Sequence, residues 1–244
     1  MPERVKRLAG LGCVHVACGQ QHCAAIGGDG TVFTWGAGGY GRLGHKDQQD
    51  LHTPKPLEEC RAKEVSCGSA STALVGWAVL RNGTVCVGAT SLFMCGRVRS
   101  ASQNAWMYPK TEDELRGWAL HAFDVGAAHN VFHADDAVIA WGSACTSGEL
   151  GLGDGGKKSS SAPTKVDSLD GFKVAQVACG IANTVLLVEG GAKVDALPEY
   201  EPPSKGPAAP AGASEEGASN GGGKAKGKRP AEGGSAEKPK KGKK

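Results

Sequence analysis

The sequence has no long hydrophobic run and few aromatic residues. Its longest apolar stretch, around residues 73–80, is interrupted by Gly76 and is far shorter than the roughly 20 residues that a membrane-spanning helix needs. The first ten residues, MPERVKRLAG, also lack the apolar core of a secretory leader. We therefore expect a soluble intracellular protein, in which the nine cysteines are reduced and mostly buried rather than paired in disulfides.

The C-terminal segment lacks the residues that build a core. Residues 202–244 contain no Trp, Tyr, Phe, Leu, Ile, Val, Met or Cys. Such a segment cannot bury enough apolar surface to offset the entropy lost on ordering it. We therefore predict a globular part at residues 1–201 and a disordered, Lys-rich tail at residues 202–244.

The net charge of +3 conceals a division between these two parts. Residues 221–244 carry eight Lys and one Arg against two Glu, a net charge of +7, which leaves −4 on the rest of the chain. The basic residues form two clusters whose spacing resembles a bipartite nuclear-import signal. They would also contact nucleic-acid phosphates without reading base sequence. We predict recognition by an importin or contact with chromatin, and the alternative is a tail that only improves solubility.

The predicted nuclear-import or anion-binding residues are Lys224, Lys226, Lys228, Arg229, Lys238, Lys240, Lys241, Lys243 and Lys244.

One unit is repeated along the globular part. It begins with a strand that ends in Cys-Gly or Val-Gly, continues with a second strand, turns at glycine and ends in a third strand. The units start near residues 14, 63, 122 and 175, and the fourth stops after its second strand. Their strand-end glycines, Gly19, Gly68, Gly126 and Gly180, are 49, 58 and 54 residues apart. This period excludes short helical repeats and is close to the length of a four-stranded propeller blade.

Alternating apolar residues locate the strands of each unit. Val16 and Cys18 are two apart, as on one face of a half-buried strand, and Trp35 and Trp141 are large enough to fill the wedge between neighbouring blades. Prolines suit the outer edge strands, where no N–H is needed. The expected strands are 16–18, 22–26, 31–36, 53–57, 65–67, 71–75, 83–88, 124–125, 129–133, 137–142, 162–166, 177–179 and 184–188.

Two of the units continue into a glycine-rich loop. Residues 35–44 read WGAGGYGRLG, and residues 141–151 read WGSACTSGELG, the same pattern with one extra residue. The pattern resembles the repeat of the regulator of chromosome condensation family, and the resemblance covers about residues 14–203. It implies an all-β, partial propeller of about four blades. The repeat residues are Gly19, Trp35, Gly36, Gly41, Leu43, Gly44, Gly68, Gly88, Gly126, Trp141, Gly142, Leu150, Gly151 and Gly180.

The second unit departs from this pattern. Val87-Gly88 stands in place of Trp-Gly, and no Gly-x-Leu-Gly follows it. This irregular unit resembles the corresponding one in a chromosomal passenger member of the family. Because a propeller hides its sheet edges by closing into a ring, an arc of so few blades should expose apolar faces at both ends. We expect the chain to be part of a longer protein, and closure through another copy or a partner is the alternative.

Three patterns resemble a dinucleotide site, a zinc site and a catalytic histidine, but each has a structural explanation. Gly36–Gly41 matches G-x-G-x-x-G, but the helix and acidic residue of a dinucleotide site do not follow. Cys13, Cys18 and Cys23 lie near two histidines, but their spacing is not that of zinc ligands.

His22 and His129 occupy equivalent repeat positions and have no partner marked by a catalytic motif. By their pattern, the few aromatic residues should lie inside, which leaves no stacking platform for single-stranded nucleic acid. We predict no catalytic residue, no metal and no cofactor.

The resemblance implies a non-catalytic binding platform of the nucleus or chromosome, with a cytoplasmic or cytoskeletal pool. Its partners would be a Ras-superfamily small GTPase, chromatin proteins, and microtubules during mitosis, and no membrane. One alternative is a guanine-nucleotide exchange factor, which acts by surface shape and needs no catalytic dyad. Another is a propeller module of a ubiquitin ligase or a kinase-type protein, of which this chain would be a fragment.

Overall fold

The computed structural model describes residues 3–79, 90–98, 105–143, 145–153 and 157–199. All of these residues except Glu199 belong to a compact unit that spans residues 1–198. The predicted tail at residues 202–244 lies outside the described residues, so its disorder stays a prediction.

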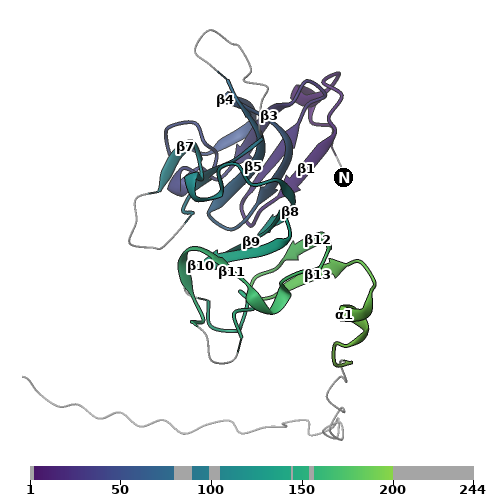
Figure 1. Cartoon of the computed structure of the whole chain (residues 1–244). Helices are drawn as coiled ribbons and strands as arrows, with labels where there is room; N and C mark the ends of the chain where they lie inside the picture. Colours follow the sequence, from purple (N-terminus) through teal and green to yellow (C-terminus); the bar gives the residue numbers. More distant parts are fainter. Residues whose placement is uncertain (1–2, 80–89, 99–104, 144, 154–156, 200–244) are drawn as a thin grey trace, which may run out of the picture. The chain divides into compact units, whose positions relative to one another are not determined.

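The compact unit consists of antiparallel sheets whose strands follow one another in sequence order (Figure 1). We call each repeat unit of the sheets a blade; the seven-stranded sheet contains two blades, which share β4. The first three blades have four strands each, and the fourth has two. The strands are β1 His15–Cys18, β2 His22–Ile26, β3 Thr31–Gly36, β4 Leu51–Cys67, β5 Ser71–Ala78, β6 Ser91–Gly96, β7 Trp106–Thr111, β8 Leu120–Val125, β9 His129–Ala134, β10 Ala137–Gly142, β11 Ser160–Lys165, β12 Val174–Cys179 and β13 Thr184–Val188.

Helical structure among the described residues is short. The 3-10 turns are η1 Lys6–Leu8, η2 Gly39–Gly41, η3 Asp113–Leu115 and η4 Asp167–Leu169. The α-helix in this part of the chain, α1 Ala192–Asp195, has four residues, and no helix there has the length and apolarity to cross a membrane. The prediction of a nearly all-β chain is confirmed.

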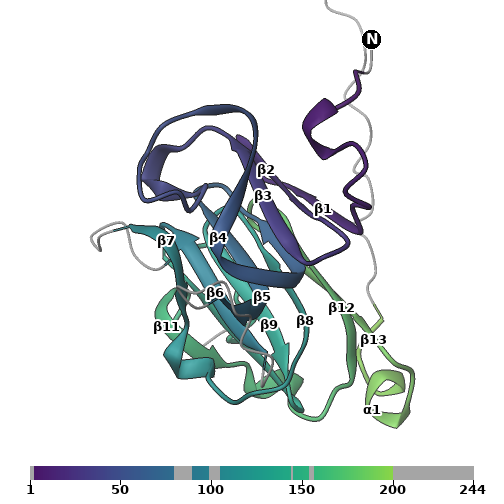
Figure 2. The ribbon, with the colours of Figure 1, turned by 90° about the horizontal axis from the view of Figure 1, so that it is seen from above.

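Strand β4 serves two blades. The sequence predicts an edge strand at 53–57 and a separate inner strand at 65–67, but both belong to the single strand β4. Its first half pairs with β3, with Pro56 opposite Phe33, and its second half pairs with β5, with Val65 opposite Leu74. Figure 2 shows β4 passing from the side of β3 to the side of β5. The first two blades are therefore covalently continuous as one seven-stranded sheet.

The third strand of the second blade is not the predicted one. The strand that pairs with β5 is β6, and Ser71 lies opposite Gly96. Gly96 packs against the Cα atom of Ser71 as Gly36 and Gly142 pack against His22 and His129, so Gly96 holds the position assigned to Gly88. The predicted strand at residues 83–88 and Gly88 itself lie outside the described residues. The prediction for this blade is wrong because Cys95-Gly96, rather than Val87-Gly88, replaces Trp-Gly.

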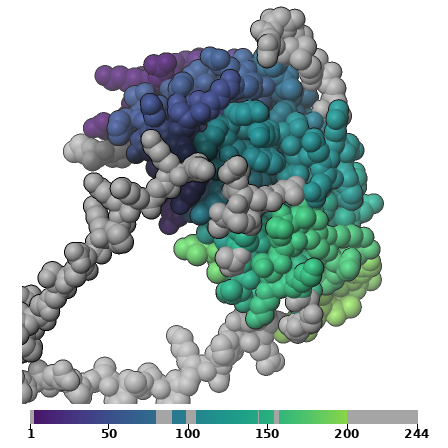
Figure 3. Space-filling view, turned by 90° about the vertical axis from the view of Figure 1, so that its left-hand side faces the viewer, coloured from purple at the N-terminus to yellow at the C-terminus, as the bar shows by residue number. Residues whose placement is uncertain are grey.

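Apolar side chains fill the spaces between successive blades. Leu57, Val65 and Phe93 belong to a core cluster shared by the first and second blades. Trp141 is fully buried between the second and third blades, where its ring stacks on Phe132 with 4.9 Å between centroids. Val131 and Val177 belong to the cluster between the third and fourth blades. In the space-filling view the blades follow one another from purple to green (Figure 3).

The two terminal blades leave apolar side chains in solvent. Val16 of β1 is 66% exposed, whereas its counterparts Val65 and Val177 are 3% and 6% exposed. The predicted burial of Val16 and Cys18 is wrong, because that face of an inner strand is covered by the preceding blade and no described blade precedes the first one. At the other end, Val185 and Leu187 of β13 are each 60% exposed.

Neighbouring blades approach most closely at the strand-end glycines. A side chain at Gly19 would collide with the carbonyl oxygen of Gly68, and one at Gly68 would lie 2.5 Å from that of Gly126. A Cβ atom at Gly126 would lie 2.7 Å from the carbonyl oxygen of Gly180. The residue after the glycine also donates to the next blade: the N–H groups of Gln20 and Ala127 bond to the carbonyls of Gly68 and Gly180, both at 3.2 Å. Glycine is therefore required sterically at each junction.

We expect Gly68→Val to destabilise the chain by about 1–3 kcal/mol, the usual cost of overpacking a filled space. The added carbon atoms would meet the backbone of Gly126 and the buried side chain of Val125. The measurement is urea unfolding followed by circular dichroism.

Gly190→Ala is the matched control, because a Cβ atom there meets nothing within 4 Å. Equal stability of the two variants would show that the glycine junction does not limit packing.

Candidate protein-interaction surface

A hydrogen-bond relay links each of the two repeat histidines, His22 and His129, to the following blade. His22 Nε2 lies 2.9 Å from Thr72 Oγ1, and that hydroxyl donates to the carbonyl oxygen of Arg42 at 2.7 Å. Because the Thr72 proton is used in this second bond, Nε2 of His22 must be the donor in the first. The relay therefore places a proton on Nε2 of the imidazole.

The same relay recurs between the third and fourth blades. His129 Nε2 lies 3.0 Å from Thr184 Oγ1, which donates to the carbonyl oxygen of Glu149 at 2.7 Å. Arg42 and Glu149 have opposite charges but occupy the same place in the Gly-x-Leu-Gly motif. Since only their backbone carbonyls take part, the motif tolerates either side chain.

These histidines are poorly suited to proton transfer with a substrate. His22 and His129 are 2% and 1% exposed. Burial, followed by the nearby Arg42 guanidinium, lowers the pKa of His22 to about 4, and burial also lowers the pKa of His129. Both imidazoles therefore serve to join blades.

The Cys and His residues near the N-terminus do not form a metal site in the described part of the chain. Cys18 and Cys23 lie opposite each other across β1 and β2, with 3.9 Å between their sulfur atoms, and Cys13 is exposed. No group of three or more potential ligands converges among the described residues.

The G-x-G-x-x-G segment folds as a blade-joining loop. The short turn η2 follows β3, and no α-helix comes after it before β4. Gly41 packs against Met107 of β7, and the N–H of Lys46 donates to the Met107 carbonyl at 2.7 Å. Its glycines thus let the loop lie against the second blade.

Arg42 anchors this loop from within. It is only 5% exposed, and its guanidinium donates to the carbonyls of Gly39 at 2.8 Å and Ser69 at 2.7 Å. The loop then presents Tyr40, which has φ of 61°, to solvent at 45% exposure. The hydrogen bonds of Arg42 thus hold Tyr40 in a backbone conformation that is energetically unfavourable for tyrosine.

Tyr40 is part of an exposed cluster that we call the aromatic–basic patch. The Arg97 guanidinium lies 4.3 Å from the centre of the Tyr40 ring. The patch consists of Tyr40 and Arg97. On β7 a second aromatic–basic group is formed by Trp106, Tyr108 and Lys110, in which the Lys110 ammonium lies 5.2 Å from the ring centre of Tyr108 and 5.7 Å from that of Trp106. Tyr108 is 41% exposed, so the expectation that the aromatic residues lie inside is wrong for Tyr40 and Tyr108.

Sequence reasoning missed this patch for a physical reason. Tyr40 lies in the glycine-rich loop, and Arg97 directly follows β6. These two residues meet only because the loop of the first blade packs onto the outer strands of the second. Sequence reasoning also missed Asp124, which accepts from Ser66 Oγ at 2.5 Å and from the N–H of Cys179 at 2.7 Å and so joins three blades.

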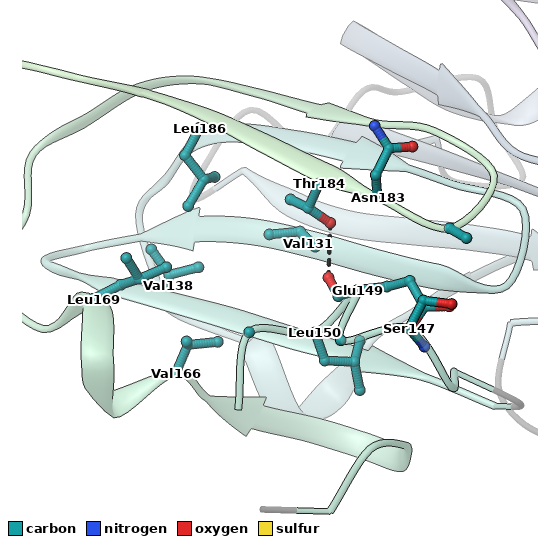
Figure 4. Close-up of a pocket in the computed structure, with 13 residues that line it drawn as sticks. Val131, Val138, Ser147, Glu149, Leu150, Val166, Leu169, Asn183, Thr184 and Leu186 are labelled. Atoms are coloured by element: carbon teal, nitrogen blue, oxygen red, sulfur yellow. Dashed lines mark hydrogen bonds between the residues drawn. The ribbon is translucent and has the colours of Figure 1, made fainter. Parts of the chain in front are cut away.

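A cavity of about 300 Å³ opens between the third and fourth blades. Figure 4 shows Leu150, Val166 and Leu169 on one side and Thr184 and Leu186 of β13 on the other. Its lining is largely apolar. It is bordered by the Gly148–Gly151 part of the second glycine-rich loop.

The remaining predicted residues are placed as follows. Trp35, Gly36, Leu43 and Gly44 lie in or beside the first glycine-rich loop, where Leu43 is 2% exposed and Trp35 is half-buried at the open end of the first blade. The predicted basic residues between Lys224 and Lys244 lie outside the described residues. Their role stays a prediction.

The chain matches known repeats and proteins. The profile of the regulator of chromosome condensation (RCC1) repeat matches residues 29–75 and 135–187, and a second profile of this repeat matches residues 13–42. Protein RCC2 of Homo sapiens is 35% identical over 196 residues, which cover 77% of this chain and 35% of that protein. The chain spans about a third of the length of such curated relatives.

Solved structures share the fold. The structure of Prp20p from Saccharomyces cerevisiae, described together with its binding properties to Gsp1p and histones, matches 75% of this chain and 45% of its own, with a TM-score of 0.54 and 18% identity. The structure of Kap60 bound to yeast RCC1 (Prp20) matches 73% and 42%, with the same TM-score and identity. At 18% sequence identity, this structural similarity shows the propeller fold alone.

We expect the stability of the chain to fall as pH decreases from about 6.5 to about 4. The pKa of His22 is lowered in the folded state, so the unfolded chain binds the extra proton first, and the stabilisation present above pH 6.5 is lost as pH approaches 4. For His22 this loss is at most about 3 kcal/mol. Urea midpoints measured between pH 7 and pH 4 follow it.

His22→Gln should flatten this dependence, because an amide can still donate to Thr72 but does not titrate. Circular dichroism at pH 7 verifies that the variant is folded. An unchanged slope in a folded variant would contradict the assignment of this pH dependence to His22.

Proposed function

Because this chain is a member of the regulator of chromosome condensation repeat family, we propose that it is a protein-binding scaffold of the nucleus and chromosome rather than a classical enzyme. The observation that carries the proposal is the aromatic–basic patch. Tyr, Trp and Arg are enriched at protein interfaces, where they supply most of the binding energy. The buried histidines provide no competing catalytic centre.

We propose a Ras-superfamily small GTPase and chromatin proteins as the partners. Prp20p, whose fold this chain shares, is described as binding Gsp1p and histones. The patch pairs Tyr40 with Arg97, and the second group pairs Tyr108 with Lys110, so each presents an exposed aromatic ring beside a positive charge. This combination suits an acidic protein surface, because opposite charges steer the encounter. Microtubule binding during mitosis rests on the family resemblance alone.

Tyr40→Ala combined with Tyr108→Ala should weaken binding to such a partner by about 10- to 100-fold, the usual loss when interface anchors are truncated. Biolayer interferometry against a panel of small GTPases and purified histones measures the effect. Lys173→Ala, an exposed basic residue away from the patch, is the control and should bind normally.

Wild-type affinity of the double variant would reject the patch as the interface. The same panel tests the exchange-factor alternative. If the chain accelerates release of a fluorescent guanine nucleotide from a bound GTPase, it is an exchange factor as well as a scaffold.

We propose that the basic tail directs the chain to the nucleus. A protein that shares this fold, yeast RCC1 (Prp20), has been crystallised bound to Kap60, and we propose an importin as the receptor of the tail. Deletion of residues 221–244 should abolish nuclear accumulation of a fluorescent fusion, and fusion of these residues to an unrelated reporter should confer it. An unchanged nuclear signal after deletion would remove the tail as the import signal.

A further inference from the structure

The junction between the second and third blades lacks the contacts that join the other blades. At the first junction His22 bonds to Thr72, and the third and fourth blades are joined in the same way. Counted from the strand-end glycines, the corresponding residues of the second junction are Ser71 and Asn130, and in the described part of the chain no hydrogen bond joins them. The backbone bond after the glycine is also missing there, because the N–H of Ser69 makes no bond to the described residues of the third blade.

A polar pocket takes the place of the missing relay. Its volume is about 160 Å³, and Ser71 and Asn130 both line it. Residues 126–128 of the third blade also line the pocket, as do Arg97 and Val98, which directly follow β6. None of the described lining residues is acidic. The small serine side chain thus leaves space where a histidine stands at the other junctions.

Contacts with three blades hold Arg97 beside this pocket. The backbone N–H of Arg97 donates to the carbonyl oxygen of Ala70 in the second blade at 2.8 Å. The carbonyl oxygen of the next residue, Val98, accepts from Nδ2 of Asn130 in the third blade at 3.4 Å. The guanidinium of Arg97 lies 4.3 Å from the ring centre of Tyr40, which belongs to the loop of the first blade. A long and half-buried side chain is therefore held in one place by its neighbours.

The guanidinium of Arg97 has no anionic partner in the described part of the chain. There it forms no ion pair, and its side chain donates no hydrogen bond. Arg42 brings a second guanidinium to 5.8 Å from the same ring centre, and it donates only to uncharged acceptors. Burial lowers the pKa of Arg42, and the charge of Arg97 lowers it further. Positive charges gathered without a counter-charge are typical of a site that attracts an anion.

We propose that Arg97 and the pocket beside it bind the carboxylate of a Glu or Asp side chain from a partner protein. The planar guanidinium carries parallel N–H donors that match the two oxygens of a carboxylate, and its contact with Tyr40 does not use these donors. The carboxylate lies toward Arg97 rather than Asn130, because Oδ1 of Asn130 is an acceptor without a partner. The proposal rests on the scaffold function proposed above and names the group that the aromatic–basic patch recognises.

Two peptides that differ in one group are the probes. They are GSEGS and GSQGS, each acetylated at the N-terminus and amidated at the C-terminus, so that the first carries a single carboxylate and the second none. Added to the full chain, GSEGS should shift the amide resonances of residues 97–98 and 126–130 in NMR spectra. GSQGS should bind about tenfold more weakly, because it cannot form charge-assisted hydrogen bonds with the guanidinium.

Substitutions in the chain give the reciprocal comparison. Arg97→Ala should remove the difference between the two peptides, and Arg97→Lys, which keeps the charge but not the paired donors, should retain only part of it. Arg116→Ala changes an exposed arginine outside the pocket lining and is the matched control. Ser71→His places in the pocket the side chain found at the other junctions and should block the peptide. Circular dichroism verifies that each variant is folded.

Three results would overturn the proposal. The first is equal binding of the two peptides, or no binding of GSEGS at millimolar concentration. The second is unchanged binding of GSEGS to a folded Arg97→Ala variant. The third is much tighter binding of the same peptide with phosphoserine in place of Glu, which would assign the site to phosphate.

Failure of the scaffold function gives a different set of results. If GSEGS binds through Arg97 while no small GTPase or histone binds, the carboxylate site is supported and those partners are rejected. If a GTPase or histone binds and Arg97→Ala leaves its affinity unchanged, the scaffold function is supported and the carboxylate site is rejected.

Discussion

The close approach of strand-end glycines is the constraint on which the rest of the structure depends. Gly19, Gly68 and Gly126 bring each inner strand so near to the next that a Cβ atom would collide with the carbonyl oxygen of Gly68, Gly126 and Gly180, respectively. This approach sets the spacing at which blade faces meet, and the Val, Leu, Phe and Trp side chains then fill the wedge that opens outward. Larger residues at the junction would separate the blades and leave those cores unfilled.

The polar contacts between blades depend on the same approach. The His22–Thr72–Arg42 relay crosses the first junction, and the His129–Thr184 pair crosses the last. Both run through buried space, where an unpaired polar atom is costly, so they specify how one blade sits against the next. The histidines that drew attention in the sequence thus act in assembly of the fold, and the surface with interface character lies elsewhere, in the aromatic–basic patch.

The repeat also makes the last blade informative. Because the first two blades show how a glycine-rich loop is covered by outer strands, the uncovered loop at Gly148–Gly151 can be compared with a filled example in the same chain. Val16 at one end of the described blades and Leu187 at the other are exposed for the same reason: no described blade covers the face on which each of them lies.

The sequence by itself determined the repeat, its all-β character and most strands, because alternating apolar residues and turn glycines are local signals. Strands β2, β3, β10 and β13 have the bounds predicted from the sequence. It failed at β6, where Cys95-Gly96 replaces Trp-Gly, and at β4, where one strand serves two blades. Only the tertiary structure brought Tyr40 beside Arg97 and exposed Tyr108 with Lys110. Contacts between residues far apart in sequence are set by how blades stack, which no local pattern encodes.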